Sequence, residues 1–246
     1  MLKILINGIN GKMGKEVASL IKKQSNMHLL CGFDRHIMHN LPHPVYNDFN
    51  QIYEIPDVII DFSVPEGTIN ILDFAAEKKI PIVIATTGFS EDEQSKIFLC
   101  SSKIPVFQSA NMSYELSLMK KIVTELSKNL QNSEIEIVET HHSQKKDAPS
   151  GTALMLANSI QEASANAYHY EFSRLLNNKK RNSKEIGFSS IRGGNIVGEH
   201  SVMFFNENET FEVKHTAYSR TIFAEGAIKA AEYIIKQPIG YYTCIE

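Results

Sequence analysis

The first 110 residues of this chain alternate short apolar runs with segments of helical spacing, and this alternation constrains the fold more than any other feature. Short buried strands separated by helices are typical of βαβ units, which build parallel sheets. We expect strands at Leu2–Asn7, His28–Phe33, Val58–Phe62, Ile80–Ala85 and Ile104–Gln108, and helices at Lys12–Lys23, Pro65–Lys79 and Glu91–Ser101. The sequence therefore predicts a doubly wound α/β domain with a parallel sheet over residues 1–111.

The pattern changes after Asn111. A helix is expected at Ser113–Lys128, and Glu134–Thr140 alternates polar and apolar residues like a strand with one solvated face. Further strands are expected at Ile186–Arg192, Ile196–Phe205 and Thr210–Thr216, and a final helix at Arg220–Lys236. The turns Gly193-Gly194 and Asn206–Glu209 suit antiparallel neighbours, and the polar stretch Ala165–Lys184 suits a mobile loop or a linker. We predict an α+β domain with a mostly antiparallel open sheet over 112–219, with 220–246 returning to the first domain.

A glycine-rich loop follows the first expected strand directly and opens the first expected helix. It reads Gly8-Ile9-Asn10-Gly11-Lys12-Met13-Gly14. A backbone without side chains can approach a pyrophosphate closely, and a helix N-terminus presents N–H groups to it. We therefore predict a Rossmann-like dinucleotide site that includes Gly8, Ile9, Asn10, Gly11, Lys12 and Met13. A tight turn that needs glycine only for its own geometry is the alternative interpretation.

The rest of the cofactor site is expected where later strands end. Asp34 follows Gly8 at about the separation at which an acidic residue binds an adenosine ribose, whereas Arg35 beside it suits a 2′-phosphate. This pair leaves both NADH and NADPH open as the cofactor. Two further strands are followed by short loops whose small hydroxyl and amide residues can contact the nicotinamide or its ribose; the loop residues expected at the cofactor are Ala85, Thr86, Thr87, Ser109, Ala110, Asn111 and Met112.

Charge and composition exclude several classes of partner. The net charge of −3 gives no basic surface for nucleic acid or anionic lipid, and no apolar run reaches 18 residues, so we expect no membrane span. The N-terminal apolar run is too short for a signal peptide, and three cysteines without C-x-x-C spacing are typical of reduced thiols. We therefore expect a cytoplasmic protein. We expect no metal site, because His36, His39 and His43 lie in a Pro-rich loop without ligand spacing.

The stretch Glu139–Ala153 carries more chemistry than any other part of the chain. It reads Glu-Thr-His-His-Ser-Gln-Lys-Lys-Asp-Ala-Pro-Ser-Gly-Thr-Ala. Its histidines can titrate near neutrality, and Ser150 is a natural N-cap for the apolar helix that follows. A helix N-terminus attracts a carboxylate or a phosphate. The stretch therefore predicts an anionic substrate held beside a proton donor.

Together these motifs resemble one family, the 4-hydroxy-tetrahydrodipicolinate reductases (dihydrodipicolinate reductases) of bacterial lysine and diaminopimelate synthesis. The block Glu139–Ala153 is the most specific match. Further matches span the chain in the family's order: Gly8–Gly14, Asp61-Phe62-Ser63, Thr86-Thr87-Gly88, Asn111-Met112-Ser113, Ile191–Gly194, Ile196–His200, His215–Ala217, Ser219-Arg220 and Phe223–Ala227. Two positions depart from the family's usual pattern, since Lys12 stands where the family has Arg and Tyr114 where it has Gly.

The resemblance implies an oxidoreductase that uses NADH or NADPH to reduce 4-hydroxy-tetrahydrodipicolinate to tetrahydrodipicolinate with loss of water. It assigns catalysis to His141 and proton donation to Lys145, although the residue types alone allow either group to deliver the proton. The substrate is then a small dicarboxylate, and its expected binding residues are His142, Lys145, Ser150, Gly151, Thr152 and Arg220. Arg220 could instead cap the final helix.

The resemblance also implies a homotetramer built from the sheets of the second domain. The sequence itself indicates only a sheet with edges available for association. Two other functions fit the cofactor loop alone: another amino-acid dehydrogenase, or a nucleotide sensor without catalysis. The intact residues His141, Lys145, Ser150, Gly151 and Thr152 favour the reductase.

Overall fold

The computed structural model describes residues 1–37, 41–165, 167–174 and 180–245, and His39 of the His/Pro-rich loop therefore lies outside the described residues. The chain divides into two compact units. Unit 1 comprises Met1–Tyr114 and Thr221–Glu246, and unit 2 comprises Glu115–Arg220. The boundaries expected from the sequence lay after residues 111 and 219. No helix of the described chain is both long and apolar enough to span a membrane.

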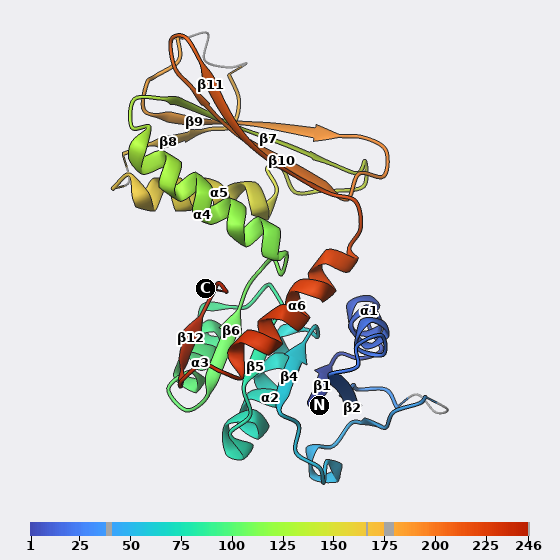
Figure 1. Cartoon of the computed structure of the whole chain (residues 1–246). Helices are drawn as coiled ribbons and strands as arrows, with labels where there is room; N and C mark the ends of the chain where they lie inside the picture. Colours follow the sequence, from blue (N-terminus) through green and yellow to red (C-terminus); the bar gives the residue numbers. More distant parts are fainter. Residues whose placement is uncertain (38–40, 166, 175–179, 246) are drawn as a thin grey trace. The chain divides into compact units, whose positions relative to one another are not determined.

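Unit 1 is a doubly wound parallel sheet of seven strands in the order β12-β6-β5-β4-β1-β2-β3 (Figure 1). Its strands are β1 Leu2–Asn7, β2 Met27–Phe33, β3 Val45–Tyr46, β4 Val58–Asp61, β5 Ile82–Ile84, β6 Pro105–Gln108 and β12 Gly240–Tyr242. Its helices are α1 Lys12–Ile21, α2 Pro65–Lys78, α3 Glu91–Cys100 and α6 Thr221–Ile234, with a 3₁₀ turn at Phe49–Gln51. The predicted fold class is confirmed.

The two faces of this sheet are covered by different helices, because both sides of its strands are apolar. Ile4 and Ile6 of β1 share a core with α1 and α6. Leu5, which points to the other face, shares a core with α2 and α3. The small residues of α6 allow close packing, since a Cβ at Gly226 would lie 1.6 Å from the carbonyl oxygen of Met112. The sequence missed β3 and β12, whose two and three residues are too short for a recognisable pattern.

Unit 2 places two helices on one face of a five-stranded sheet with the order β11-β10-β7-β9-β8. The elements are α4 Tyr114–Asn129, β7 Glu134–His141, α5 Gly151–Ala163, β8 His169–Glu171, β9 Glu185–Arg192, β10 Gly198–Phe205 and β11 Thr210–Ala217. β10 runs antiparallel to both of its neighbours, whereas β9 runs parallel to β7 and β8, so the sheet is mixed, where a mostly antiparallel sheet was predicted. Alternate residues of β7, including Ile135 and Ile137, are buried in the core beneath the helices.

The prediction that Gly193-Gly194 joins neighbouring strands is wrong, because β7 lies between β9 and β10. The β9–β10 loop instead crosses the end of β7 and exchanges backbone hydrogen bonds with it. Gly193 N–H donates to the His141 carbonyl at 2.9 Å, and His142 N–H donates to the Ile196 carbonyl at 2.8 Å. These bonds hold the segment that follows β7 in place.

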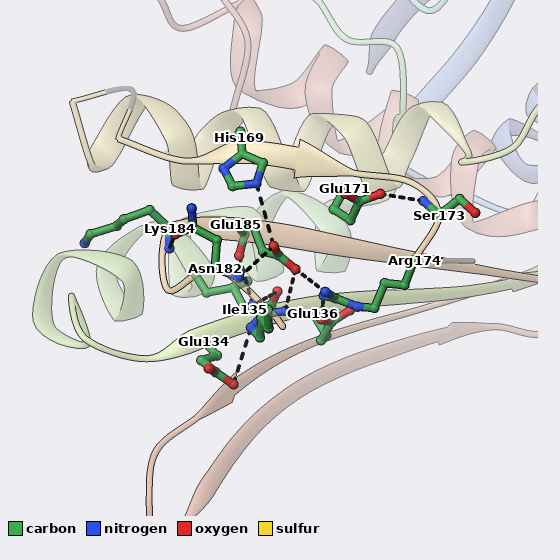
Figure 2. Close-up of polar contacts among 11 residues, drawn as sticks. Glu134, Ile135, Glu136, His169, Glu171, Ser173, Arg174, Asn182, Lys184 and Glu185 are labelled. Carbon is green, nitrogen blue, oxygen red and sulfur yellow. Dashed lines mark hydrogen bonds and ion pairs between the residues drawn. The ribbon is translucent and has the colours of Figure 1, made fainter. Parts of the chain in front are cut away.

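Part of the expected mobile loop Ala165–Lys184 forms the edge strand β8, so for residues 169–171 that expectation is wrong. Charged groups stabilise this edge, as Figure 2 shows. The carboxylate of Glu185, 4% exposed, accepts from the backbone N–H of Asn182 at 3.0 Å, forms an ion pair with Arg174 and lies 3.6 Å from His169 Nε2. A buried carboxylate needs such partners, and local polarity alone does not reveal them.

Candidate active site

The glycine loop of unit 1 has the geometry of a nucleotide-binding turn. Gly8 has a φ of +80°, which side-chain-bearing residues rarely adopt, and its Cβ would lie 2.6 Å from the Phe62 carbonyl oxygen. A Cβ at Gly14 would lie 2.2 Å from the Gly8 carbonyl oxygen. The chain therefore needs glycine at both positions to bring the start of α1 against the loop. Gly11 is the N-cap of α1 and makes no side-chain capping bond.

A cleft of about 450 Å³ lies beside this loop, wholly within unit 1. It is lined from the ends of β1, β2 and β4 and from the start of α2. Ligands of open α/β sheets bind at the carboxyl ends of the strands, and this cleft is in that place. Of the residues predicted to hold the cofactor, the cleft brings together Gly8, Asn10, Gly11, Asp34 and Arg35.

Asp34 and Arg35 at the end of β2 make different contacts. The Asp34 carboxylate accepts from the backbone N–H of Asn10 at 3.0 Å and of His36 at 3.3 Å, so it ties the loop after β2 to the glycine loop. The guanidinium of Arg35 forms an ion pair with Glu66, the second residue of α2. Both side chains of this pair are largely exposed.

The carboxylate of Asp61 is fully buried under the cleft, and the sequence did not predict a role for it. It accepts hydrogen bonds from Asn7 Nδ2 at 2.8 Å, Ser63 Oγ at 2.6 Å, Thr68 Oγ1 at 2.5 Å and Thr86 Oγ1 at 2.9 Å. Burial raises the pKa of Asp61 above its usual value, against these hydrogen bonds, which lower it. Asp61 thus joins four segments around the cleft. The Thr86 hydroxyl, which was predicted to contact the cofactor, donates its hydrogen bond to Asp61 instead.

The remaining predicted cofactor residues differ in exposure. Ala110 and Thr87 are exposed, and Ala85 is partly exposed. Met112 is 6% exposed and belongs to the core of unit 1. The Ser109 hydroxyl donates to the Asn111 carbonyl at 2.7 Å, which closes the turn after β6. Lys12 and Met13 begin α1, and Ile9 is buried beneath it.

The chemistry of unit 2 centres on His141, the last residue of β7. This residue is 7% exposed, and its Nδ1 lies 2.5 Å from Glu139 Oε2. Burial lowers the pKa of His141 below its usual value, although the bond to Glu139 works in the opposite direction. The imidazole is therefore neutral near pH 7. Since an ionised Glu139 can only accept, Nδ1 carries the proton and Nε2 presents a lone pair.

Glu139 is held in its ionised form by Arg192. The carboxylate, 1% exposed, accepts from Arg192 Nη2 at 2.6 Å and Nη1 at 2.8 Å, and from the Ser150 backbone N–H at 3.2 Å. Burial alone would raise the pKa of Glu139, but hydrogen bonds from Arg192, Ser190 and His141 hold it at about 2. Arg192 also donates to the Asp147 carbonyl at 2.7 Å, which ties the loop before α5 to the same network.

Ser150 links this network to the start of α5. Its hydroxyl accepts from the Ala153 N–H at 3.2 Å, as expected of an N-cap, and lies 2.9 Å from His200 Nε2. The His200 ring lies 5.1 Å from that of His141, and burial lowers the pKa of His200 to about 4. Gly151 and Thr152 begin α5, where the helix dipole favours an anion and the first turn contains no acidic residue.

The predicted cationic and polar groups lie in the segment after β7 and at the end of unit 2. Lys145 Nζ pairs with Asp147 Oδ1 at 2.9 Å, and the Lys145 side chain is 20% exposed. His142 is partly exposed, and its backbone bonds to the β9–β10 loop. Arg220 is exposed and precedes α6. Unit 2 thus gathers His141, His142, Lys145, Ser150 and the α5 N-terminus around the end of β7.

Sequence reasoning did not identify the contributions of Glu139, Arg192 and His200. A signal for Glu139 was present, because residues two apart on a strand share a face and Glu139 precedes His141 by two. Arg192 is 53 positions from Glu139, and its contact depends on the parallel pairing of β7 with β9. Among the described residues, no three His, Cys, Asp or Glu side chains cluster as a metal site would require.

Comparison with known proteins covers both units. Residues 2–112 match the family model described as dihydrodipicolinate reductase, N-terminus, and residues 116–246 match dihydrodipicolinate reductase, C-terminus. A 4-hydroxy-tetrahydrodipicolinate reductase of Caldanaerobacter subterraneus subsp. tengcongensis is 45% identical, over 99% of this chain and 96% of its own. One of Clostridium novyi is 40% identical, over 99% of this chain and 96% of its own.

Solved structures share the fold. A dipicolinate-bound dihydrodipicolinate reductase from Paenisporosarcina sp. TG-14 superposes with a TM-score of 0.84 at 23% identity, covering 99% of this chain and 98% of that one. A C. glutamicum DAP dehydrogenase in complex with DAP gives a TM-score of 0.61 at 13% identity, covering 100% of this chain and 93% of that one.

Proposed function

Because this chain belongs to the dihydrodipicolinate reductase family, we propose that it reduces 4-hydroxy-tetrahydrodipicolinate to tetrahydrodipicolinate, with loss of water, in diaminopimelate and lysine synthesis. The electron donor is NADH or NADPH. The observation that carries the proposal is the network around His141, where an ionised Glu139 orients a neutral imidazole beside Lys145 and the α5 N-terminus. A nucleotide-sensing protein would have no use for such a buried network.

The cofactor fits unit 1. Gly8 and Gly11 line the cleft of about 450 Å³ at the start of α1, where backbone N–H groups suit a pyrophosphate, and the same cleft has Asp34 for the ribose. When bound, the cofactor supplies a hydride. We assign its binding to Gly8, Ile9, Asn10, Gly11, Lys12, Met13, Asp34, Arg35, Ala85, Thr86, Thr87, Ser109, Ala110, Asn111 and Met112. Thr86 acts through its hydrogen bond to Asp61, which orders the loop after β5.

Unit 2 holds the substrate and supplies the proton. The ammonium of Lys145 pairs with Asp147 and can donate a proton, whereas the neutral His141 presents a lone pair at Nε2. Lys145 is therefore the proton donor, and His141 accepts a hydrogen bond that orients the reacting groups. The residue types alone left both His141 and Lys145 open as the proton donor, and this proposal assigns the role to Lys145.

The two carboxylates of the substrate need separate donors. The backbone N–H groups of Gly151 and Thr152 at the start of α5 suit one carboxylate, because the helix dipole is positive there. His142, Lys145 and Arg220 add charge-assisted hydrogen bonds to the other. Ser150 contributes by capping the helix and fixing its first turn.

A coupled assay tests the function. Aspartate semialdehyde, pyruvate and the upstream synthase generate the substrate, and NAD(P)H absorbance reports its reduction. We expect oxidation of NAD(P)H only when all three are present. Absence of substrate-dependent oxidation by the pure protein, with an active synthase, would refute the reductase. Lys145→Met should lower kcat by about 100-fold or more with the dissociation constant of NADH unchanged.

We further propose a cytoplasmic homotetramer that associates through the sheet of unit 2. Its outer residues Ile191 and Phe211 are 52% and 51% exposed, which suits burial against another copy. Light scattering after size exclusion measures the mass, and Phe211→Lys should shift it toward smaller species.

A further inference from the structure

Arg35 is the cation that the cleft of unit 1 offers to a nucleotide. Among the described residues that line this cleft, it has the one positively charged side chain, next to Asp34 at the end of β2. NADPH differs from NADH by a phosphate on the adenosine ribose, and a nearby arginine accommodates that phosphate in Rossmann folds. Discrimination between NADH and NADPH therefore depends on whether Arg35 is free to bind the 2′-phosphate of NADPH.

Arg35 is already engaged by Glu66. Its guanidinium forms an ion pair with the Glu66 carboxylate, and the two side chains are 65% and 70% exposed. Glu66 lies in the first turn of α2, between the cleft-lining residues Val64 and Gly67. The helix dipole stabilises a carboxylate at this position, and the ion pair with Arg35 places Glu66 at the edge of the cleft.

A 2′-phosphate would have to compete with this carboxylate. The phosphate carries about −1.5 to −2 charges at pH 7. To bind Arg35 it must replace Glu66, and it then lies near two carboxylates, Glu66 and Asp34, of which Glu66 has lost its partner. The ribose hydroxyls of NADH face no such conflict, because the Asp34 oxygens, which accept from the Asn10 and His36 N–H groups, retain lone pairs for them.

We propose that Glu66 is a specificity-determining residue that makes this chain prefer NADH to NADPH by holding Arg35. The inference rests on the proposed function, since it assumes that a nicotinamide dinucleotide binds in the cleft. It assigns to Glu66 an effect on the 2′-phosphate alone, and no role in hydride transfer.

Equilibrium binding tests this without turnover. NADH and NADPH are titrated separately, through nucleotide fluorescence, into the wild-type protein and into Glu66→Gln. We expect Glu66→Gln to tighten NADPH binding about fivefold, the upper range for an exposed ion pair, and to change NADH binding by less than about twofold. Added salt should reduce the gain, because the charges are exposed.

Glu77→Gln is the matched control. Glu77 lies on the same helix, is 71% exposed and pairs with Lys78 at 2.7 Å, but lies at the other end of α2. It should leave both affinities unchanged. In an Arg35→Gln background the effect of Glu66→Gln on NADPH should be smaller, because the part that acts through Arg35 is then absent.

Three results would overturn the inference: tighter wild-type binding of NADPH than of NADH, equal changes for both cofactors in Glu66→Gln, or an undiminished effect in the Arg35→Gln background. If the wild-type protein binds both cofactors and Glu66→Gln changes neither affinity, the inference fails while the proposed function stands. If it binds neither cofactor, both fail.

Discussion

Replacement of Glu139 by glutamine probes the network around His141 most directly. The change keeps the shape of the side chain and removes its charge, which faces the Arg192 guanidinium and His141 Nδ1. The amide that replaces the carboxylate would then satisfy Arg192 only through its oxygen. We therefore expect both a loss of stability and a loss of catalysis.

The stability loss can be worked from the charge balance. The network holds the pKa of Glu139 at about 2, against an ordinary value of 4.5, which corresponds to about 3 kcal/mol of stabilisation of the ionised carboxylate. The pKa is depressed in the folded state, so this contribution is present above pH 4.5 and is lost as the pH falls toward 2. Removing one partner of a buried ion pair typically costs about 3–5 kcal/mol, which agrees with this value.

Urea unfolding followed by circular dichroism measures the stability, since the chain has no tryptophan. We expect Glu139→Gln to lower the free energy of unfolding by about 3 kcal/mol at pH 7, and the difference from wild type to shrink below pH 4.5. In the coupled assay kcat should fall about 10- to 100-fold, as when a carboxylate that orients a metal-bound histidine is lost. The dissociation constant of NADH should not change, because the cleft lies in unit 1.

Glu134→Gln is the control, because Glu134 is on the same strand but its side chain is 50% exposed, and its partner Arg181 keeps ion pairs with Glu136 and Glu185. It should cost no more than about 1 kcal/mol. A loss below about 1 kcal/mol in Glu139→Gln, independent of pH, would refute the charge argument. An equal loss in both variants would show that the sheet, rather than this network, determines the effect.

Three further predictions concern other parts of the chain. Gly14→Ala should weaken NADH binding at least about tenfold in a fluorescence titration, because its Cβ would lie 2.2 Å from the Gly8 carbonyl oxygen; unchanged binding would contradict the loop geometry. Ser150→Ala should lower the free energy of unfolding by about 1 kcal/mol in urea, because α5 loses its N-cap, and an unaltered midpoint would count against this role. The buried His200 has its pKa lowered from 6.5 to about 4, so the folded state favours the neutral ring; its contribution to stability is full above pH 6.5 and is lost as the pH falls toward 4. In His200→Gln the free energy of unfolding should depend less on pH over that range than in the wild type. An identical pH profile in both proteins would contradict this prediction.

Much of the fold could be predicted because its signals are local. The strand Leu2–Asn7 and the start of the helix at Lys12 agree with the structure to the residue. Apolar runs, turn glycines and the N-cap Ser150 depend on neighbours within a few positions, where periodicity and capping apply. The edge strands β8 and β12 were missed, because three residues carry too little periodicity and pairing with a neighbouring strand is what makes them strands.

By itself, the sequence determined the doubly wound class of unit 1, the glycine loop and, through motifs such as the block Glu139–Ala153, the family. Only the tertiary structure decided that β7 lies at the centre of its sheet, that Arg192 reaches Glu139 across 53 positions, and that Arg35 pairs with Glu66 across 31. Such contacts arise when strand order and helix packing bring distant segments together. The free energy of a buried charge depends on the groups that these segments place around it. The protonation state of His141 is therefore a property of the fold, although the histidine itself is plain in the sequence.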